Sequence, residues 1–281
     1  MELVVVAKSA QAAVIACALA AAGAGCNAVL GLANTTPVDA AVDAYTGPAC
    51  LVTNMHDEDC DGIPDATDNC PGIANPGQED VLEVMNGQPA DGIGDACDPS
   101  PTKTGDRRTR FISFADPNEA LEWMVQAGRW VVADDAYLYT GSNSSTPELT
   151  VLLAQRPVMP FAANLRVELV DVPAATTETF GVSLDLGATA GCEIQTGASS
   201  LLHVTEGGGT SFPVPSGTFA PGTAFTIRGE IVLGVVHCSI DGVVAGTFSN
   251  SGTLSNQLGL YGGHGTFRVT YLELYDLSGE P

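Results

Sequence analysis

Basic residues are scarce in this sequence. Its 281 residues include 10 Lys and Arg against 33 Asp and Glu, so the formal net charge is −23. A nucleic-acid-binding surface needs clustered positive charge to neutralise phosphates, and an anionic lipid surface attracts proteins through the same kind of charge. The scarcity of Lys and Arg therefore excludes nucleic acid as a partner and argues against electrostatic binding to a membrane surface.

Acidic residues are concentrated in one part of the chain. Residues 56–98 contain twelve acids and no Lys or Arg, whereas residues 99–281 contain 18 acids and 9 bases. Disorder does not explain the composition, because 45% of the residues are hydrophobic and only 15% are charged. The chain is therefore predicted to fold and to consist of unlike parts.

The N-terminal segment is predicted to direct export. Residues 12–25 form a run of small apolar residues that is too short to span a membrane comfortably and typical of a signal-peptide core. The run ends in Ala-Gly-Ala-Gly before Cys26, which resembles a bacterial lipoprotein signal, although Gly23 stands where Leu is usual. The resemblance implies a signal peptide over residues 1–25, lipidation of Cys26 and membrane attachment through that lipid.

A plain secretory signal, cleaved at a nearby Ala-x-Ala site, is the alternative interpretation. Both interpretations predict an exported protein. A lipoprotein would lie at the cell surface or outer membrane, and the alternative product would be periplasmic or secreted. Residues 26–50 are rich in Ala, Thr, Pro and Gly, so they are predicted to form a flexible tether.

Six cysteines follow the proposed lipidation site. An even number of cysteines in an exported protein indicates disulfides, because the compartment is oxidising. The sequence alone leaves the pairing open, but chain proximity favours three pairs: Cys50–Cys60, Cys70–Cys97 and Cys192–Cys238. Zinc is the competing interpretation, and the absence of any C-x-x-C and of a His at ligand spacing argues against it.

The acidic segment begins with the spacing of a calcium-binding loop. Counted from residue 57, positions 1, 3, 5, 9 and 12 are all Asp and position 6 is Gly62. Calcium takes six to eight oxygen ligands, so alternate carboxylates suit it, and position 7 adds a backbone carbonyl. The predicted ligands are Asp57, Asp59, Asp61, Ile63 through its carbonyl, Asp65 and Asp68. Asn69-Cys70-Pro71 follows at once and leaves no exit helix, which excludes an EF-hand.

The residues after this loop identify a repeat. Asp68-Asn69-Cys70-Pro71, then Asn-Pro-Gly-Gln at 75–78, then Asp-Gly-Ile-Gly-Asp-Ala-Cys-Asp at 91–98 resemble the thrombospondin type 3 repeat. The resemblance implies a helix-poor calcium-binding module over residues 51–100, in which Asn69 can also contribute. An acidic linker without bound metal is the alternative. The regular spacing of the aspartates, Gly62 and the Cys70-Pro71 pair argue against it.

A second calcium loop is predicted within the same repeat. Asp91, Ile93, Asp95 and Asp98 match positions 5, 7, 9 and 12 of the first loop. Positions 1 and 3 fall on Gly87 and Pro89, which have no carboxylates. Residues 81–90 therefore look like an insertion, and the acids that can replace the missing ligands are Glu79, Asp80 and Glu83.

Residues 107–281 are predicted to form an all-β domain. Apolar and polar residues alternate with period two in several short runs, such as 180–186, 225–228 and 236–241, and Gly, Asn, Asp and Pro cluster between the runs. Only residues 117–126 indicate a helical turn. About 170 residues of short alternating strands are typical of a single sandwich or jelly roll.

The order of landmarks in this domain resembles the concanavalin A-like (laminin-G or lectin-type) jelly roll. The landmarks are Gly-Arg-Trp-Val-Val at 128–132, Val-His-Cys-Ser-Ile-Asp-Gly at 236–242 and a closing strand at 267–275. Such domains include carbohydrate binders and glycosidases. The sequence has neither the E-x-D-x-x-E strand motif of laminarinase-type enzymes nor a G-x-S-x-G, so we do not expect an enzyme.

The sequence therefore favours a calcium-stabilised adhesion or binding protein that presents a jelly roll to a glycan or an extracellular protein. A secreted glycan hydrolase and a structural envelope component are the alternatives. Trp123, Trp130 and Tyr137 are predicted to be core residues in preference to sugar-stacking platforms. Tyr261 and His264, expected in a glycine-rich turn between late strands, are the candidate ligand-binding residues.

Overall fold

The computed structural model describes residues 50–52, 55–141, 148–154, 159–171, 179–186, 190–196, 201–205, 210–214, 219–249 and 256–279. All of them belong to one compact unit, Gly47–Pro281. The predicted signal peptide, Cys26 and nearly all of the tether lie outside the described residues. Within the described part of the chain, no helix has the length and apolar character needed to cross a membrane.

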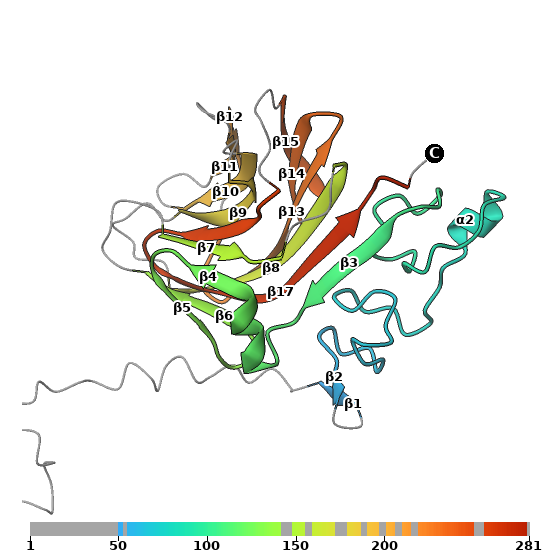
Figure 1. Ribbon diagram of the computed structural model, residues 1–281, viewed down its shortest axis with the longest axis horizontal. Coiled ribbons are helices and arrows are strands. Elements are labelled where there is room, and N and C mark those ends of the chain that lie inside the picture. Colours follow the sequence, from blue (N-terminus) through green and yellow to red (C-terminus); the bar gives the residue numbers. More distant parts are fainter. Residues whose placement is uncertain are drawn as a thin grey trace, which may run out of the picture. The chain divides into compact units, whose positions relative to one another are not determined.

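Two antiparallel sheets make up the C-terminal domain (Figure 1). The first has seven strands, in the spatial order β12-β11-β10-β9-β16-β7-β4. Its members are β4 (Trp123–Val125), β7 (Glu148–Leu152), β9 (Thr179–Asp185), β10 (Ala190–Gln195), β11 (Leu201–Thr205), β12 (Thr210–Pro213) and β16 (Gly259–Gly262).

The second sheet has eight strands. Seven of them follow the order β15-β14-β13-β8-β17-β6-β5, and β3 pairs with β17. Its members are β3 (Arg107–Ile112), β5 (Arg129–Val132), β6 (Tyr137–Thr140), β8 (Phe161–Asp171), β13 (Ala224–Val232), β14 (Val235–Ile240), β15 (Val243–Ser249) and β17 (Thr266–Asp276).

The core lies between the two sheets. Alternate side chains of strands such as β13 are buried in it, as the period-two pattern predicts, and Phe180, Val182 and Leu184 of β9 are all at most 2% exposed. Trp123 and Tyr137 are 5% and 1% exposed, and their rings contact one another. The all-β jelly-roll prediction is confirmed, and these aromatic residues belong to the core.

A disulfide joins the two sheets through this core. It links Cys192 of β10 to Cys238 of β14, and both residues are fully buried. Two further disulfides, Cys50–Cys60 and Cys70–Cys97, lie in the preceding segment. These are the three pairs that chain proximity favours.

The predicted helical turn at residues 117–126 is shorter in the structure. A 3-10 helix, η4, covers Pro117–Glu122, and β4 begins at Trp123. The Asp116 side chain accepts a hydrogen bond from the backbone N–H of Asn118 and so caps the N-terminus, where Pro117 also suits a first turn. The second half of the prediction was wrong because Trp123 is buried between the sheets, and this burial places residues 123–125 in a strand.

The acidic segment contains little regular structure. Two antiparallel strands of two residues each, β1 (Leu51–Val52) and β2 (Met55–His56), lie at its start. The four-residue helix α2 (Leu82–Met85) interrupts it. The rest is turns, which agrees with the helix-poor repeat that the sequence predicts. Gly62 and Gly92 have φ values of +95° and +93°, a backbone conformation that favours glycine.

The repeat packs against the second sheet of the sandwich. The Cys70–Cys97 disulfide and Ile93 form a buried apolar cluster with residues of β8, β17 and the chain after β17, namely Ala162, Tyr275 and Leu277. Arg108 of β3 donates hydrogen bonds to the backbone carbonyls of Asp68 (2.7 Å) and Asn69 (3.1 Å). The end of the first acidic loop is therefore held directly by the sandwich.

We expect Arg108→Gln to weaken this attachment. Arg108 also lies 3.6 Å from a carboxylate oxygen of Glu273, whose side chain is only 2% exposed, so the substitution removes the partner of a buried acid. The loss should lower the free energy of unfolding by about 2 kcal/mol. Arg107→Gln is the matched control, because the Arg107 side chain is 73% exposed and its ion pair with Asp276 should contribute about 0.5 kcal/mol. Equal effects of the two variants in urea unfolding would contradict this role for Arg108.

Candidate metal centres

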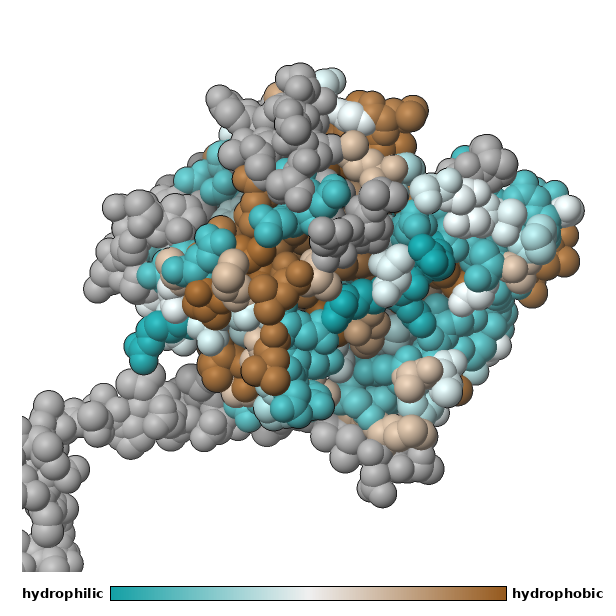
Figure 2. Space-filling view, viewed as in Figure 1, coloured by the Kyte–Doolittle hydropathy of each residue, from teal (hydrophilic) through white to brown (hydrophobic). Residues whose placement is uncertain are grey.

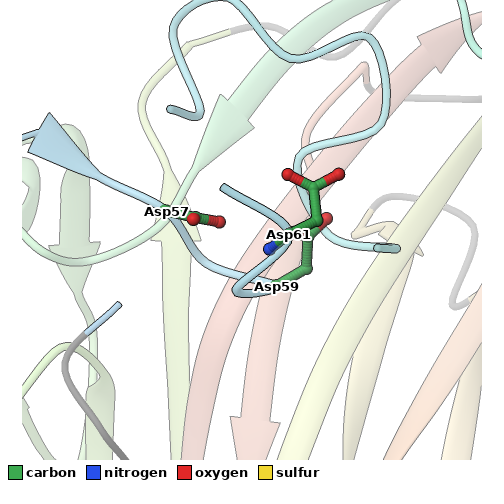
Figure 3. A group of neighbouring side chains, drawn as sticks. All are labelled: Asp57, Asp59 and Asp61. Atoms are coloured by element: carbon green, nitrogen blue, oxygen red, sulfur yellow. The ribbon is translucent and has the colours of Figure 1, made fainter. Parts of the chain in front are cut away.

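The first acidic loop brings three of the predicted ligands together. Carboxylate oxygens of Asp57, Asp59 and Asp61 all lie within 4.8 Å of one another, in the loop that follows β2 (Figure 3). Backbone N–H groups shape the loop: Gly62 donates to Asp57 Oδ2 at 2.9 Å and Ile63 donates to Asp61 Oδ1 at 2.8 Å. Asn75 also donates its N–H to Asp61 Oδ2 at 2.8 Å, so both oxygens of Asp61 are held, whereas Asp57 is held through Oδ2.

Two oxygens of this cluster are buried without a partner. Asp57 Oδ1 and Asp59 Oδ2 accept no hydrogen bond from the described residues. Burial, together with the neighbouring carboxylates of Asp61, Asp68 and Asp57, raises the pKa of Asp59 to about 7. Buried polar atoms are normally paired, and unpaired carboxylate oxygens facing one another are unfavourable unless a cation lies between them. The first cluster therefore has the properties of a cation site.

The second loop repeats the hydrogen bonds of the first. Gly92 donates its N–H to Asp80 Oδ2 at 3.0 Å, as Gly62 does to Asp57. Ile93 donates to Asp91 Oδ1 at 3.1 Å, as Ile63 does to Asp61. By these contacts, Asp80 takes the place of Asp57 and Asp91 takes the place of Asp61.

The same correspondence continues to the end of each loop. The N–H groups of Glu58 and Val81 donate to Asp65 Oδ1 and Asp95 Oδ1, respectively. The N–H groups of Cys70 and Ser100 donate to Asp68 Oδ1 and Asp98 Oδ1, at 2.7 Å in both loops. The two loops therefore have the same backbone plan despite the insertion.

Helix α2 supplies the remaining acid of the second cluster. Glu83 lies in this helix, and its carboxylate joins those of Asp80 and Asp91 within 4.8 Å. Glu83 is fully buried, and neither of its carboxylate oxygens accepts a hydrogen bond from an N–H or O–H group of the described residues. Burial and the adjacent Asp98 raise the pKa of Glu83. Glu83 thus occupies the place that Asp59 has in the first loop.

The positions that sequence spacing could not fill are therefore filled by two acids at the N-terminal end of the insertion, one just before it and one just inside it. Gly87 and Pro89 occupy positions 1 and 3 by count, but Asp80 and Glu83 occupy them in space. Of the three substitutes considered, Glu79 contributes its backbone carbonyl, which accepts the N–H of Asp95 at 2.8 Å, and its carboxylate is not in the cluster. The only sequence evidence for Glu83 as a metal ligand was that it is an acid within the acidic repeat.

Other predicted ligands have different surroundings. Asp65 accepts hydrogen bonds from the His56 ring (2.7 Å) and the N–H of Glu58 (2.8 Å), and is not among the three clustered acids. The Asn69 side chain bonds Asn75 and Gln78 within the repeat. Ile93 is 3% exposed in the apolar cluster against the sandwich, so its side chain serves packing. Asp68 is 3% exposed and close enough to Asp59 to raise its pKa.

The donor chemistry of both clusters fits calcium. Each consists of carboxylates, with neither nitrogen nor sulfur among the grouped ligand atoms. Hard oxygen ligands with several negative charges suit calcium, whereas zinc sites use Cys and His. The cysteines near the clusters are in disulfides and cannot ligate a metal. The residues present therefore match the cofactor that the sequence indicates.

The two candidate ligand-binding residues lie in the sandwich. Tyr261 was expected in a turn, but it lies within β16, and its side chain is on the outer face of the seven-stranded sheet because its neighbour Leu260 is in the core. The prediction was wrong for Tyr261 because Gly259–Gly262 pairs on both sides, with β7 and β9, and the glycine-rich turn begins only after Gly262. His264 does lie between β16 and β17.

Three acids on the described strands of the seven-stranded sheet have different surroundings. Glu193 of β10 faces outward, since Cys192 and Ile194 beside it are in the core. Glu148 accepts a hydrogen bond from the Tyr139 hydroxyl, and Asp185 is fully buried.

Comparison with known proteins agrees with the repeat. Residues 45–78 match the family model of the thrombospondin type 3 repeat. The repeat class binds calcium, and this chain carries acidic clusters able to hold a metal. No curated protein matches the sequence.

Solved structures similar to the chain have sandwich folds. A protein of unknown function with a galectin-like fold from Bacillus subtilis is 9% identical with a TM-score of 0.48, covering 61% of this chain and 97% of that one. SCLam, a non-specific endo-β-1,3(4)-glucanase from family GH16, is 9% identical with a TM-score of 0.47, covering 62% and 92%. An endo-acting O-glycanase from the human gut microbiota is 10% identical with a TM-score of 0.47, covering 61% and 100%. Likenesses of this degree do not identify a ligand or an activity.

Proposed function

We propose that this protein is an exported calcium-binding protein in which two ions hold the thrombospondin type 3 repeat in its folded form against the sandwich. One observation carries the proposal: both loops have the same hydrogen-bond plan, and both leave buried carboxylate oxygens without partners at equivalent places. A repeated arrangement of this kind is hard to explain by packing alone.

In the folded repeat, backbone N–H groups orient the carboxylates of each site. Asp57 and Asp80 each accept a glycine N–H with one oxygen, and the second oxygen of each is buried without a partner among the described residues. A bound calcium ion would supply two positive charges there, which would offset the repulsion among the acids and lower their pKa values. Folding of the repeat is then linked to ion binding, because the unfolded chain does not hold these acids together.

Calorimetric titration of the full chain with calcium tests this proposal. We expect binding of two ions. Glu83→Gln should weaken one of them by about tenfold or more while leaving the other unchanged, because one charged ligand is lost from the second cluster only. Glu79→Gln is the matched control, since it removes a neighbouring acid whose carboxylate is outside the cluster. No heat of binding, or equal loss in both variants, would contradict the assignment.

The disulfides of the chain support export. Three disulfides and a thrombospondin type 3 repeat indicate an extracellular protein. We further propose that residues 1–25 are a lipoprotein signal, that lipid on Cys26 anchors the chain at the cell surface or outer membrane, and that residues 26–50 are a tether. The repeat at 51–100 would then be a calcium-stiffened spacer for the sandwich at 107–281.

Lipidation predicts a change of compartment in one variant. Cys26→Ser should move the protein from the membrane fraction to the soluble fraction of a bacterial host, because a lipid chain provides the proposed attachment. Cys17→Ser, a cysteine inside the predicted signal, is the control and should stay membrane-bound. A wild-type protein found in the soluble fraction, with an N-terminus from an Ala-x-Ala cleavage, would contradict lipidation and support the plain secretory signal.

For the sandwich we propose a binding role toward a glycan or extracellular protein. The outward-facing polar residues of the seven-stranded sheet support binding. The sequence has no E-x-D-x-x-E strand motif, which argues against the alternative of a glycan hydrolase. A glycan array probed with and without calcium tests this role. Cleavage of any arrayed glycan would favour the hydrolase, and the absence of any bound ligand would favour the structural envelope component.

A further inference from the structure

A row of side chains crosses the outer face of the seven-stranded sheet. Strand register places residues directly opposite one another from β12 to β7, and residues opposite one another in an antiparallel sheet share a face. The row consists of Ser211, His203, Glu193, Gly181, Tyr261 and Leu149. Its members come from six different strands, so the row lies across the sheet.

Tyr261 lies over the glycine of this row and reaches toward Glu193. The position that a Cβ of Gly181 would occupy is 2.8 Å from the Tyr261 hydroxyl and 3.0 Å from the Cα atom of Glu193. The tyrosine hydroxyl is buried and has no hydrogen-bond partner among the described residues. A buried hydroxyl without a partner is costly, so its place beside an acid indicates that a ligand group completes it.

Among the residues that the structure describes, no cationic side chain pairs with Glu193. Neither a hydrogen bond nor an ion pair joins it to the described residues, and burial alone raises its pKa. His203, directly opposite on β11, does not supply a charge: Ser211 and Gln195 hold its two ring nitrogens at 2.7 and 2.6 Å, and burial lowers its pKa. The row therefore contains one carboxylate without an ion-pair partner, one buried phenol without a hydrogen-bond partner and one neutral imidazole.

We propose that this row binds a ligand carrying a primary ammonium group, held by the Glu193 carboxylate and the Tyr261 hydroxyl and ring. An ammonium group forms a charge-assisted hydrogen bond with a carboxylate, and it is attracted to the face of an aromatic ring. It also donates the hydrogen bond that the tyrosine oxygen lacks. The net charge of −23 would draw a cationic ligand toward the protein.

This inference rests on the proposed binding role of the sandwich and names the chemistry of that role. An ammonium group could come from an unacetylated amino sugar or from a lysine side chain. In both sources the ammonium group would bond Glu193. The two sources differ in the group that carries the ammonium, a sugar ring or a peptide side chain, so the test includes both.

The decisive comparison uses glucosamine oligomers and N-acetylglucosamine oligomers of equal length, with lysine-containing peptides as a third probe. Titrations are made on the full chain in calcium. We expect binding of the free amine, whether from the oligomer or from the peptide, and at least about tenfold weaker binding of the acetylated oligomer, because acetylation removes the charge. Equal binding of both oligomers would overturn the proposal and indicate a site for sugar hydroxyls.

Variants separate this site from general attraction to an acidic protein. Glu193→Gln should weaken amine binding about tenfold, and Tyr261→Phe should weaken it severalfold. Glu168→Gln, which removes the same charge from β8 of the other sheet, should have no effect. Equal weakening by Glu168→Gln would overturn the proposal. Thermal unfolding checks that each variant folds, and calcium titration of the same samples shows whether the calcium assignment stands when amine binding fails.

Discussion

Removal of calcium is expected to lower the midpoint of thermal unfolding of the whole protein by about 10 °C or more. An ion present at a thousand times its dissociation constant stabilises the folded state by about 4 kcal/mol, and a chain of this size shifts by about 2–4 °C per kcal/mol. The effect should reach the sandwich, because Arg108 of β3 binds the carbonyls that close the first loop and Ile93 packs against β8 and β17.

Differential scanning calorimetry in millimolar calcium and in excess chelator provides the measurement. Magnesium at the same ionic strength is the control, because its smaller octahedral coordination suits these loops poorly. Limited proteolysis should show cleavage within residues 57–98 only after chelation. Unchanged unfolding in chelator, with the repeat still resistant to protease, would contradict the dependence of this segment on calcium.

Loss of the Cys192–Cys238 disulfide is expected to have an effect of similar size. The bond closes a loop with a sequence separation of 46 and joins β10 of one sheet to β14 of the other. In the chain-entropy model such a loop contributes about 4 kcal/mol, so the double variant Cys192→Ala/Cys238→Ala should unfold about 8–16 °C lower. Both cysteines are fully buried in the core. Alanine is chosen in preference to serine because a serine would bury a hydroxyl group there.

The variant Cys50→Ala/Cys60→Ala is the comparison for this prediction. Its loop has a sequence separation of only 10, so the same model gives about 2.7 kcal/mol, and the bond lies in the N-terminal part of the described chain. Calorimetry should therefore show the larger shift for the pair that crosses the sandwich. A larger shift for the Cys50–Cys60 pair would indicate that the disulfide between the sheets is not a main support of the fold.

The first acidic loop could be predicted well from the sequence because its ligands are local. Carboxylates at alternate positions, with Gly62 between them, reach one ion without help from distant segments. The structure clusters Asp57, Asp59 and Asp61 as this spacing requires. Asp65 shows the limit of counting, because its oxygens bond His56 and Glu58, which the spacing alone does not reveal.

The second loop could not be completed from the sequence because an insertion breaks the count. In the structure, a backbone hydrogen bond identifies Asp80 as the equivalent of Asp57. The grouping of carboxylates identifies Glu83 as the equivalent of Asp59. The helix that carries Glu83 is only four residues long, which is too short for a helical repeat of apolar residues to be recognised in the sequence. The hydrophilic surface at the right of Figure 2 belongs largely to this repeat.

Strands of the sandwich were visible in the sequence, but the row across them was not. Alternation predicts which side chains of a strand face the core. The outward position of Tyr261 comes from the structure, because the sequence suggested a turn there. Whether two outward-facing residues lie side by side depends on strand order and register, which are set by pairing between distant segments. Gly181 lies between Glu193 and Tyr261 because β9 lies between β10 and β16, and this strand order could not be predicted from the sequence.

The most direct test of the account is anomalous X-ray diffraction from crystals of the full chain grown in calcium. The account predicts two anomalous difference peaks, one within about 2.3–2.6 Å of carboxylate oxygens of Asp57, Asp59 and Asp61 and one at the same distances from those of Asp80, Glu83 and Asp91. A map with no peak at either cluster would contradict the central claim that these two loops are equivalent calcium sites.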